Sequence, residues 1–166
     1  MKMNPYTPDD YDKNLCLKPS FELYVILFFG IKDFLLVIIP AIASFKTKST
    51  NLDYLSSLVQ PEMFIADMMV IFVWLALINR RQGQNSLWMR IWNKGRMILA
   101  FSYSIQAVIL AIEISMNVAK VPNWIKAIDF RLASLFAVTL FLLITLLRNK
   151  RIKETFLDWP EQKSAG

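Results

Sequence analysis

The sequence predicts an all-α integral membrane protein: a four-helix bundle of four transmembrane helices, with a short interfacial helix between the second and third. Two features of composition lead to this prediction. Hydrophobic residues make up 55% of the 166 residues and charged residues 19%, whereas soluble domains average about 45–50% and about 25%. The third observation is a set of four apolar segments, each approaching the roughly 20 residues that a helix needs to cross a bilayer.

The first predicted transmembrane helix runs from Phe21 to about Phe45, with Ser20 as its N-cap. Gly30 and Pro40 are candidate kink sites within it. The small residues near its end resemble a signal-peptide cleavage site. We do not expect cleavage, because about twenty residues precede the run and the charged pair Lys32-Asp33 interrupts it.

The second and third predicted helices, Met63 to Ile78 and Met97 to about Ile114, are short, so we expect either that flanking side chains snorkel or that the bilayer thins locally. Between them, Ser86 to Lys94 is predicted to form a separate interfacial helix. Its face of Trp88, Ile91 and Trp92 suits the headgroup level, where Trp is favoured. We interpret Trp88 and Trp92 as anchors, with a docking face for a partner as the alternative.

The fourth predicted helix runs from about Ile125 to Leu147 and continues into a basic tail. It should end near Asp158, because Pro160 cannot continue a helix and disfavours helical geometry in Trp159. Trp159 is the third candidate anchor. The predicted organisation is an N-terminal segment 1–20, a transmembrane domain 21–147 and a C-terminal tail 148–166.

The distribution of Lys and Arg predicts that both termini are cytoplasmic. The N-terminal segment, the second loop and the tail together carry 13 of these residues, whereas the first and third loops carry four. The positive-inside rule places the richer side in the cytoplasm. We therefore read the net charge of +6 as topological signalling and lipid headgroup contact, and expect no nucleic-acid partner.

Charges inside the predicted spans are the candidate functional residues. We favour a structural role, in which charge pairs fix the helix register, with a transport, proton or partner role as the alternative. Lys32 and Asp33 lie midway along the first helix, where they cost roughly 5–7 kcal/mol together and nearly cancel its apolar residues. We predict that Lys32 pairs with Asp67 or Glu113, and Arg131 with Glu113 or Asp129. Ser102, Gln106 and Glu113, at steps of four and seven, predict a polar stripe that faces the bundle. The candidate cluster of six charges consists of Lys32, Asp33, Asp67, Glu113, Asp129 and Arg131.

Four stretches outside the spans resemble the YfeZ-like family of small bacterial inner-membrane proteins, a domain of unknown function. These stretches are Tyr11-Asp12-Lys13 through Leu17-Lys18-Pro19, Gln60-Pro61-Glu62, Trp92-Asn93-Lys94-Gly95-Arg96 and Phe156-Leu157-Asp158-Trp159-Pro160-Glu161. The resemblance covers most of the chain and implies four spans in a bacterial inner membrane. It implies no catalytic residues.

The composition also excludes several kinds of site and of catalysis. The chain has no His and one Cys, Cys16, which excludes a structural zinc site, an intramolecular disulfide and His-based catalysis. We expect no enzyme activity and no cofactor. Beside the lipid bilayer, we expect a protein partner or a homo-oligomer. The leading hypothesis is an accessory or scaffold subunit of a membrane assembly. The alternative is a small homo-oligomeric transporter or channel that uses the intramembrane charges.

Overall fold

The structure is a computed structural model, and it describes the chain apart from residues 1–5, 13–15, 47–60, 81–85, 121–129 and 161–166. Within these described ranges every regular element is a helix, and an isolated bridge joins Tyr11 to Leu17. The elements are η1 (Pro8–Asp10), α1 (Phe21–Gly30), α2 (Lys32–Lys46), η3 (Pro61–Met63), α4 (Phe64–Ile78), α5 (Ser86–Lys120), α7 (Phe130–Arg148) and α8 (Lys150–Leu157).

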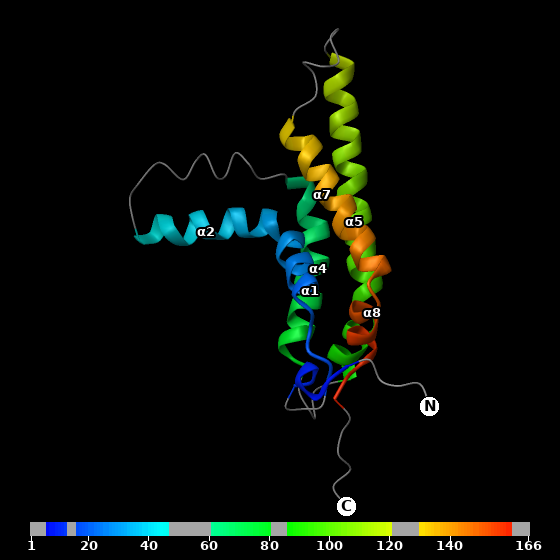
Figure 1. The fold of residues 1–166 in the computed structure, drawn as a ribbon. Coiled ribbons are helices and arrows are strands. Elements are labelled where there is room, and N and C mark those ends of the chain that lie inside the picture. Colours follow the sequence, from blue (N-terminus) through cyan, green and yellow to red (C-terminus); the bar gives the residue numbers. More distant parts are fainter. Residues whose placement is uncertain (1–5, 13–15, 47–60, 81–85, 121–129, 161–166) are drawn as a thin grey trace, which may run out of the picture.

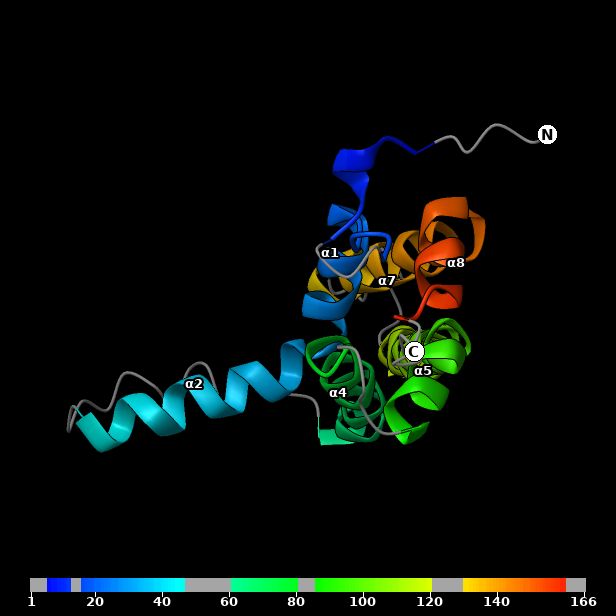
Figure 2. The same ribbon diagram turned by 90° about the horizontal axis from the view of Figure 1, so that it is seen from below.

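Five helices pack into an elongated bundle, and α2 leaves it sideways (Figure 1). The long helix α5 is the axis of the bundle: α4 and α7 pack along it, and α8 covers its first turns. α1 packs against α4 and also contacts α5 and α7. The view along the bundle shows α2 pointing away from all the other helices (Figure 2).

Two apolar clusters fill the bundle. The larger one joins α1, α4, α5, α7 and α8, and its largest fully buried side chains are Trp92, Tyr103 and Phe156. The smaller one, near the upper end of α5, consists of Met63, Leu110 and Leu132. Many large apolar side chains on the outside of the bundle remain exposed. By length and composition, α5 and α7 are apolar enough to cross a membrane, while α1 and α4 are shorter apolar helices.

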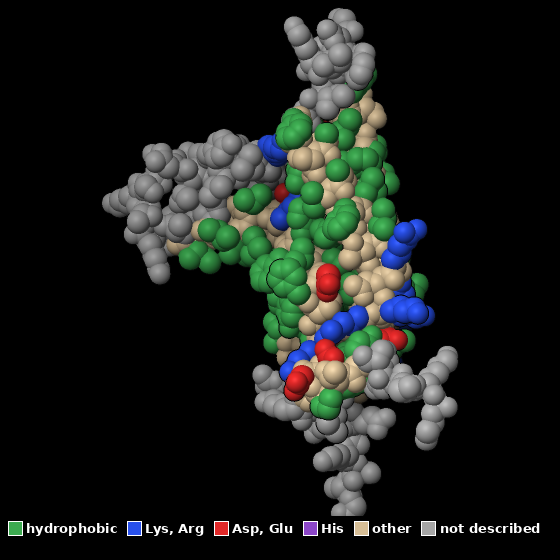
Figure 3. Space-filling model, viewed as in Figure 1, with side chains coloured by type: hydrophobic (Ala, Val, Ile, Leu, Met, Phe, Trp, Pro, Cys, Tyr) green, Lys and Arg blue, Asp and Glu red, His purple; other side chains and the backbone are tan. Residues whose placement is uncertain are grey.

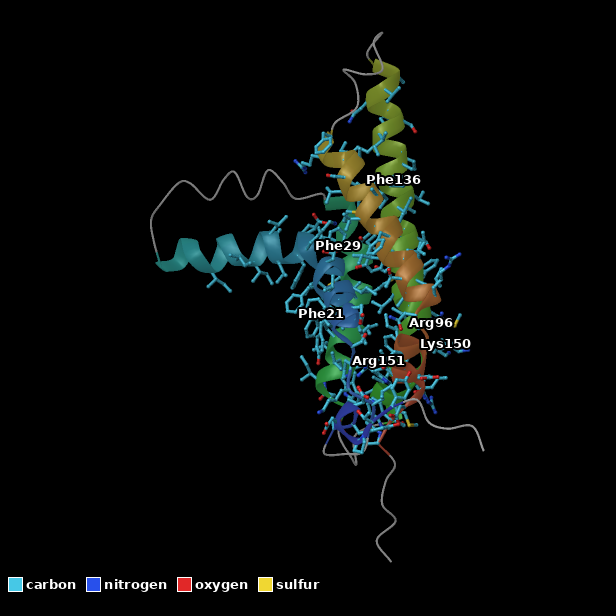
Figure 4. The ribbon with its side chains drawn as sticks, viewed as in Figure 1. Phe21, Phe29, Arg96, Phe136, Lys150 and Arg151 are labelled. Carbon is cyan, nitrogen blue, oxygen red and sulfur yellow. The ribbon has the colours of Figure 1, made fainter. Side chains whose placement is uncertain are left out.

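Charged side chains are concentrated towards the lower end of the bundle. In Figure 3, hydrophobic side chains cover much of the face above them. Arg96, Lys150 and Arg151 all lie at this lower end, on α5 and α8 (Figure 4). The bundle therefore has one charged end and an apolar body.

Local sequence explains several helix ends. The Ser20 hydroxyl accepts a hydrogen bond from the N–H of Leu23, as predicted for the N-cap of α1. The second apolar segment forms α4 within one residue of its predicted start. The last helix ends at Leu157, just before Asp158, as predicted. The start of the fourth predicted helix, from Ile125 to Asp129, lies outside the described residues.

Three predicted boundaries are wrong. The first apolar segment is two helices, α1 and α2, separated at Ile31. The predicted interfacial helix is absent as a separate element, because residues from Ser86 form the first turns of α5. α5 contains no Pro and one Gly, Gly95, whose cost of about 1 kcal/mol does not end a helix. The tail is not continuous with α7, because the Asn149 side chain accepts a hydrogen bond from the N–H of Ile152 and starts α8.

Candidate functional site

The candidate site lies where the first apolar segment breaks. We call it the helix-break site and define it as Gly30, Lys32, Asp33, Asp67 and Gln106. α1 ends at Gly30, and Ile31 adopts a non-helical backbone conformation with φ −112° and ψ 17°. Gly30 packs tightly on α4, since an added Cβ would lie 2.9 Å from Cγ2 of Val70. Glycine therefore permits the close approach of α1 to α4 at this point.

Asp67 on α4 supplies the N-terminal cap of α2. Its side-chain oxygen Oδ2 accepts a hydrogen bond of 2.9 Å from the backbone N–H of Phe34, in the first turn of α2. The Asp67 residue is fully buried. The first N–H groups of a helix have no partner within the helix and carry its positive dipole end, so a carboxylate stabilises them. A helix that starts inside the bundle thus receives its cap from a neighbouring helix.

Gln106 on α5 completes the site from the third side. Its amide Nε2 lies 3.3 Å from Oδ1 of Asp67 and 3.5 Å from the carbonyl oxygen of Gly30, the last residue of α1. One turn earlier on the same face, the Ser102 hydroxyl donates to the carbonyl of Ala66. Both Ser102 and Gln106 are fully buried. This part of the predicted polar stripe faces the bundle. Gln106 donates to a carbonyl at the end of α1 that the break leaves free, and Ser102 donates to a carbonyl within α4.

The predicted partner of Lys32 is wrong. Its ammonium Nζ lies 2.6 Å from Oδ2 of Asp33, the next residue, and above the ring of Phe29. The pairing occurs because both residues lie in the first turn of α2, directly after the break, and not in the middle of a regular helix. The Asp33 side chain is 3% exposed and the Lys32 side chain 17%, so the pair reaches the edge of the bundle.

The structure does not bring all six predicted charges together. Glu113 lies two turns beyond Gln106 on α5, roughly 10 Å further along the helix. Arg131 is the second residue of α7, whose first turn lies above the level of the break (Figure 1). Asp129 lies outside the described residues. The site therefore contains Lys32, Asp33 and Asp67, with Gln106 as a neutral fourth member.

Two of the three Trp residues predicted as anchors are partly buried, and the third is buried completely. Trp92 has no exposed surface, so its assignment as a headgroup anchor is wrong. Its indole Nε1 donates to the carbonyl of Thr155, 3.0 Å away, and its ring packs 4.7 Å from that of Phe156 on α8. Trp88 and Trp159 are partly buried against the same core cluster. The turns of α5 predicted to lie on a membrane surface instead receive α8.

A second polar arrangement at the lower end was not predicted from sequence. We call it the Arg80 latch and define it as Leu17, Arg80, Trp92 and Asp158. The guanidinium of Arg80 donates to the carbonyl oxygens of Leu17 (2.9 Å) and Asp158 (2.7 Å) and lies over the ring of Trp92. The carboxylate of Asp158 in turn accepts from the N–H of Leu17, 2.5 Å away. The latch joins the N-terminal segment to the residues that follow α8.

The surroundings shift the pKa values of three groups at this end of the bundle. Burial raises the pKa of the Cys16 thiol to about 11. Hydrogen bonds from the N–H and hydroxyl of Thr7, together with Arg151, lower the pKa of Asp10. The hydrogen bond from the Tyr6 hydroxyl to Glu154 raises the pKa of Tyr6 to about 12. The hydrogen bonds between Thr7 and Asp10 lie within the N-terminal segment. The contacts of Asp10 with Arg151 and of Tyr6 with Glu154 join this segment to α8.

Comparison with known proteins gives one match. A family model described as "Protein of unknown function (DUF2919)" matches residues 6–158. No curated protein and no solved structure matches the chain. In the part of the chain that the structure describes, no group of three or more His, Cys, Asp or Glu residues is placed to hold a metal ion.

Proposed function

Since this chain belongs to the DUF2919 family, which is described as of unknown function, we propose from its structure that it is a non-enzymatic accessory or scaffold subunit of an assembly in a bacterial inner membrane. The observation that carries the proposal is the helix α2, which contacts α4 at its first turn and then leaves the bundle (Figure 2). The resemblance to small bacterial inner-membrane proteins supports the location.

The direction of each helix supports four membrane segments with both ends in the cytoplasm. α1 and α5 lead away from the charged lower end, and α4 and α7 return to it (Figure 1). Tyr6 and Glu154, near the two ends of the described chain, are hydrogen-bonded to each other there. The excess of Lys and Arg in the segments at this end supports a cytoplasmic position.

The first segment supports docking because it is incomplete as a span. α1 has 10 residues and is about 15 Å long, half the thickness of a bilayer core. α2 then turns aside, with apolar side chains on several faces; Ile39 and Ile42 are each 56% exposed. A helix that is apolar all round is normally buried in a larger protein or in lipid. A partner that covers α2 would complete the segment.

The chemistry of α2 supports a membrane helix as the partner. Membrane helices approach closely where small residues line their interface, and the sequence of α2 from Pro40 to Ser44 is rich in such residues. The elbow between α1 and α2 adds an apolar concavity of about 610 Å³, lined by residues that include Phe28 and Leu36. Phe21 and Phe29 lie on α1 along this side (Figure 4). The hydrogen bonds of the helix-break site hold α2 at an angle to α1. This angle leaves the concavity of the elbow open to a partner.

The test is to purify the tagged protein from its native host in mild detergent and to weigh the intact particle by native mass spectrometry. We expect a heteromeric particle. Ile39→Ala/Ile42→Ala should lose the partner. Ile144→Ala/Leu147→Ala, which changes two similarly exposed residues of α7, should retain it. A homo-oligomer or a monomer of the wild-type protein would refute the scaffold proposal, as would equal loss of the partner in both variants.

The second candidate function is a small homo-oligomeric transporter or channel. Its support is the buried carboxylate of Asp67 on α4, which lies at the N-terminal end of α2, the second half of the broken segment. Transporters use the ends of broken helices to bind ions and substrates near the middle of the bilayer. A pH-dependent flux in proteoliposomes that is lost in Asp67→Asn, while the variant remains folded, would favour this candidate. The absence of flux in wild-type proteoliposomes would eliminate it.

A further inference from the structure

A second apolar concavity lies on the opposite side of the bundle from the N-terminal segment, between α4 and α5. We call it the α4–α5 groove. It has a volume of about 660 Å³ and is lined by Met69, Phe72, Ile91, Lys94, Met97 and Phe101, among others. Phe72, Met97 and Phe101 are 48%, 76% and 60% exposed. Figure 2 shows α1, α7 and α8 on the other side of this helix pair. The volume is within the range of about 300–1,000 Å³ typical of ligand sites.

The groove carries a charge only in its lower part. Lys94 is its one basic lining residue, and the apolar lining residues Met97 and Phe101 follow on the same face of α5. Arg90 lies one turn before Lys94 on that face and is exposed, as Lys94 is. From the charged lower end upwards, this face of α5 therefore presents two cations and then an apolar surface.

We propose that the α4–α5 groove binds one anionic phospholipid, with its phosphate on Lys94 and Arg90 and an acyl chain along Met97 and Phe101. The polarity of the groove matches this ligand from end to end: cations at headgroup level attract anionic lipids, and the apolar lining replaces the environment of the bilayer for the chain. The proposal rests on the membrane location proposed above, but not on the docking of a partner at α2.

The lining favours a lipid over a second protein helix. Helix interfaces in membranes are enriched in small residues that allow close backbone approach, as in the second half of α2. The α4–α5 groove is instead lined by Phe, Met and Ile side chains. These flexible and aromatic side chains line a space of about 660 Å³ that suits a flexible acyl chain. Lys94 can extend its ammonium to the headgroup while its methylene stem stays on the apolar surface.

The experiment uses the full-length protein, stripped of lipid in detergent and titrated with phosphatidylglycerol or with phosphatidylcholine of the same acyl chains. Native mass spectrometry counts the lipid molecules bound. We expect one phosphatidylglycerol per protein, bound more tightly than phosphatidylcholine. Arg90→Gln/Lys94→Gln should weaken phosphatidylglycerol binding roughly 25-fold, about fivefold for each cation removed. The control Lys150→Gln/Lys153→Gln, which removes two cations from α8, should bind like the wild type.

A second variant tests the position of the acyl chain without removing charge. Met97→Trp fills the groove at an exposed position, so it should fold normally and displace the bound lipid. Equal binding of the two lipids, equal loss in the control variant, or an undiminished adduct in Met97→Trp would each overturn the proposal. Because this assay uses the isolated protein, its failure is independent of the particle purified from the host. If the protein forms a heteromer but has no lipid site, only the lipid proposal fails. If it has the lipid site but no partner, only the scaffold proposal fails.

Discussion

The carboxylate of Asp67 and the backbone N–H of Phe34 are 33 positions apart in sequence and 2.9 Å apart in the structure. Through this hydrogen bond, α4 fixes the position at which α2 begins. The same carboxylate is held by Gln106 from α5, so three helices meet at one side chain. The angle of α2, and with it the elbow proposed for docking, depends on this contact.

Asp67→Ala should destabilise the protein by about 1–2 kcal/mol, because it removes the cap of α2 and leaves buried donors without an acceptor. Asp67→Asn should cost less, since its amide oxygen still accepts from Phe34. Thermal unfolding in detergent, followed by far-UV circular dichroism, measures both. Ser104→Ala is the control, because the Ser104 hydroxyl is exposed and bonds only within α5. An Asp67→Ala variant that melts like the control would contradict the capping role.

Lys32 and Asp33 should behave as a coupled pair. Removing one partner of a buried ion pair leaves the other charge uncompensated and costs about 3–5 kcal/mol when burial is complete, whereas replacing both by apolar residues is often neutral. Because Lys32 is partly exposed, we expect the lower part of that range for Lys32→Leu. The double variant Lys32→Leu/Asp33→Leu should be more stable than Lys32→Leu alone. A double-mutant cycle of unfolding free energies measures the coupling, and additive effects would show that the pair is not coupled.

Gly95→Ala should displace α8 from the bundle. A Cβ at position 95 would lie 2.5 Å from Cε1 of Phe156, and Val73 closes the space on the other side. Overpacking of this kind costs about 1–3 kcal/mol. The smaller side chain in Gly95→Ala/Phe156→Leu should relieve the clash and recover part of the loss. Asn93→Ala, exposed on the same helix, is the matched control, and no rescue by Phe156→Leu would show that Phe156 does not limit the space.

Sequence predicted those elements whose limits are set locally. The segment that forms α4 is apolar except for Asp67, and Pro61 and Asn79 flank it. Its length follows from these two neighbours. The capping of α1 by Ser20 and the end of α8 before Pro160 are equally local. The all-helical fold follows from apolar segments of this length together with few residues that break helices.

The helix-break site was predicted only in part, because its geometry depends on distant residues. Long apolar stretches precede Gly30 and follow the charged pair Lys32-Asp33, so the segment reads as one helix. What ends α1 there is the packing of Gly30 on Val70 and the cap from Asp67. Trp92 was misassigned for a similar reason: aromatic residues beside basic ones are typical of a headgroup region, and only the packing of Phe156 from α8 shows that Trp92 is buried.

Arg80→Lys should open the Arg80 latch. The guanidinium reaches two carbonyl oxygens at once and stacks on Trp92, and a single ammonium cannot reproduce this geometry. We expect a loss of about 1.5–3 kcal/mol in the local stability of the N-terminal segment, the range for hydrogen bonds of charged groups. Hydrogen exchange at the amide of Leu17, which donates to Asp158, measures it. Arg148→Lys, exposed on α7, is the control, and unchanged protection of Leu17 in Arg80→Lys would contradict the latch.

Cys16 should react slowly with thiol reagents in the folded protein. Its side chain is buried, and burial raises its pKa from 9.0 to about 11. Because the thiolate is the reactive form, a shift of about two units lowers its fraction at pH 8 roughly a hundredfold. Alkylation by a maleimide should therefore be slow at pH 8 and become faster up to about pH 11, whereas the denatured protein should level off near pH 9. The neutral thiol is the form favoured by folding, so its contribution to stability is complete below pH 9 and is lost as the pH rises towards 11.

Ser86→Cys in a Cys16→Ser background provides an exposed thiol as the control. Equal alkylation rates for Cys16 and this exposed thiol at pH 8 would show that the N-terminal segment does not stay closed over Cys16.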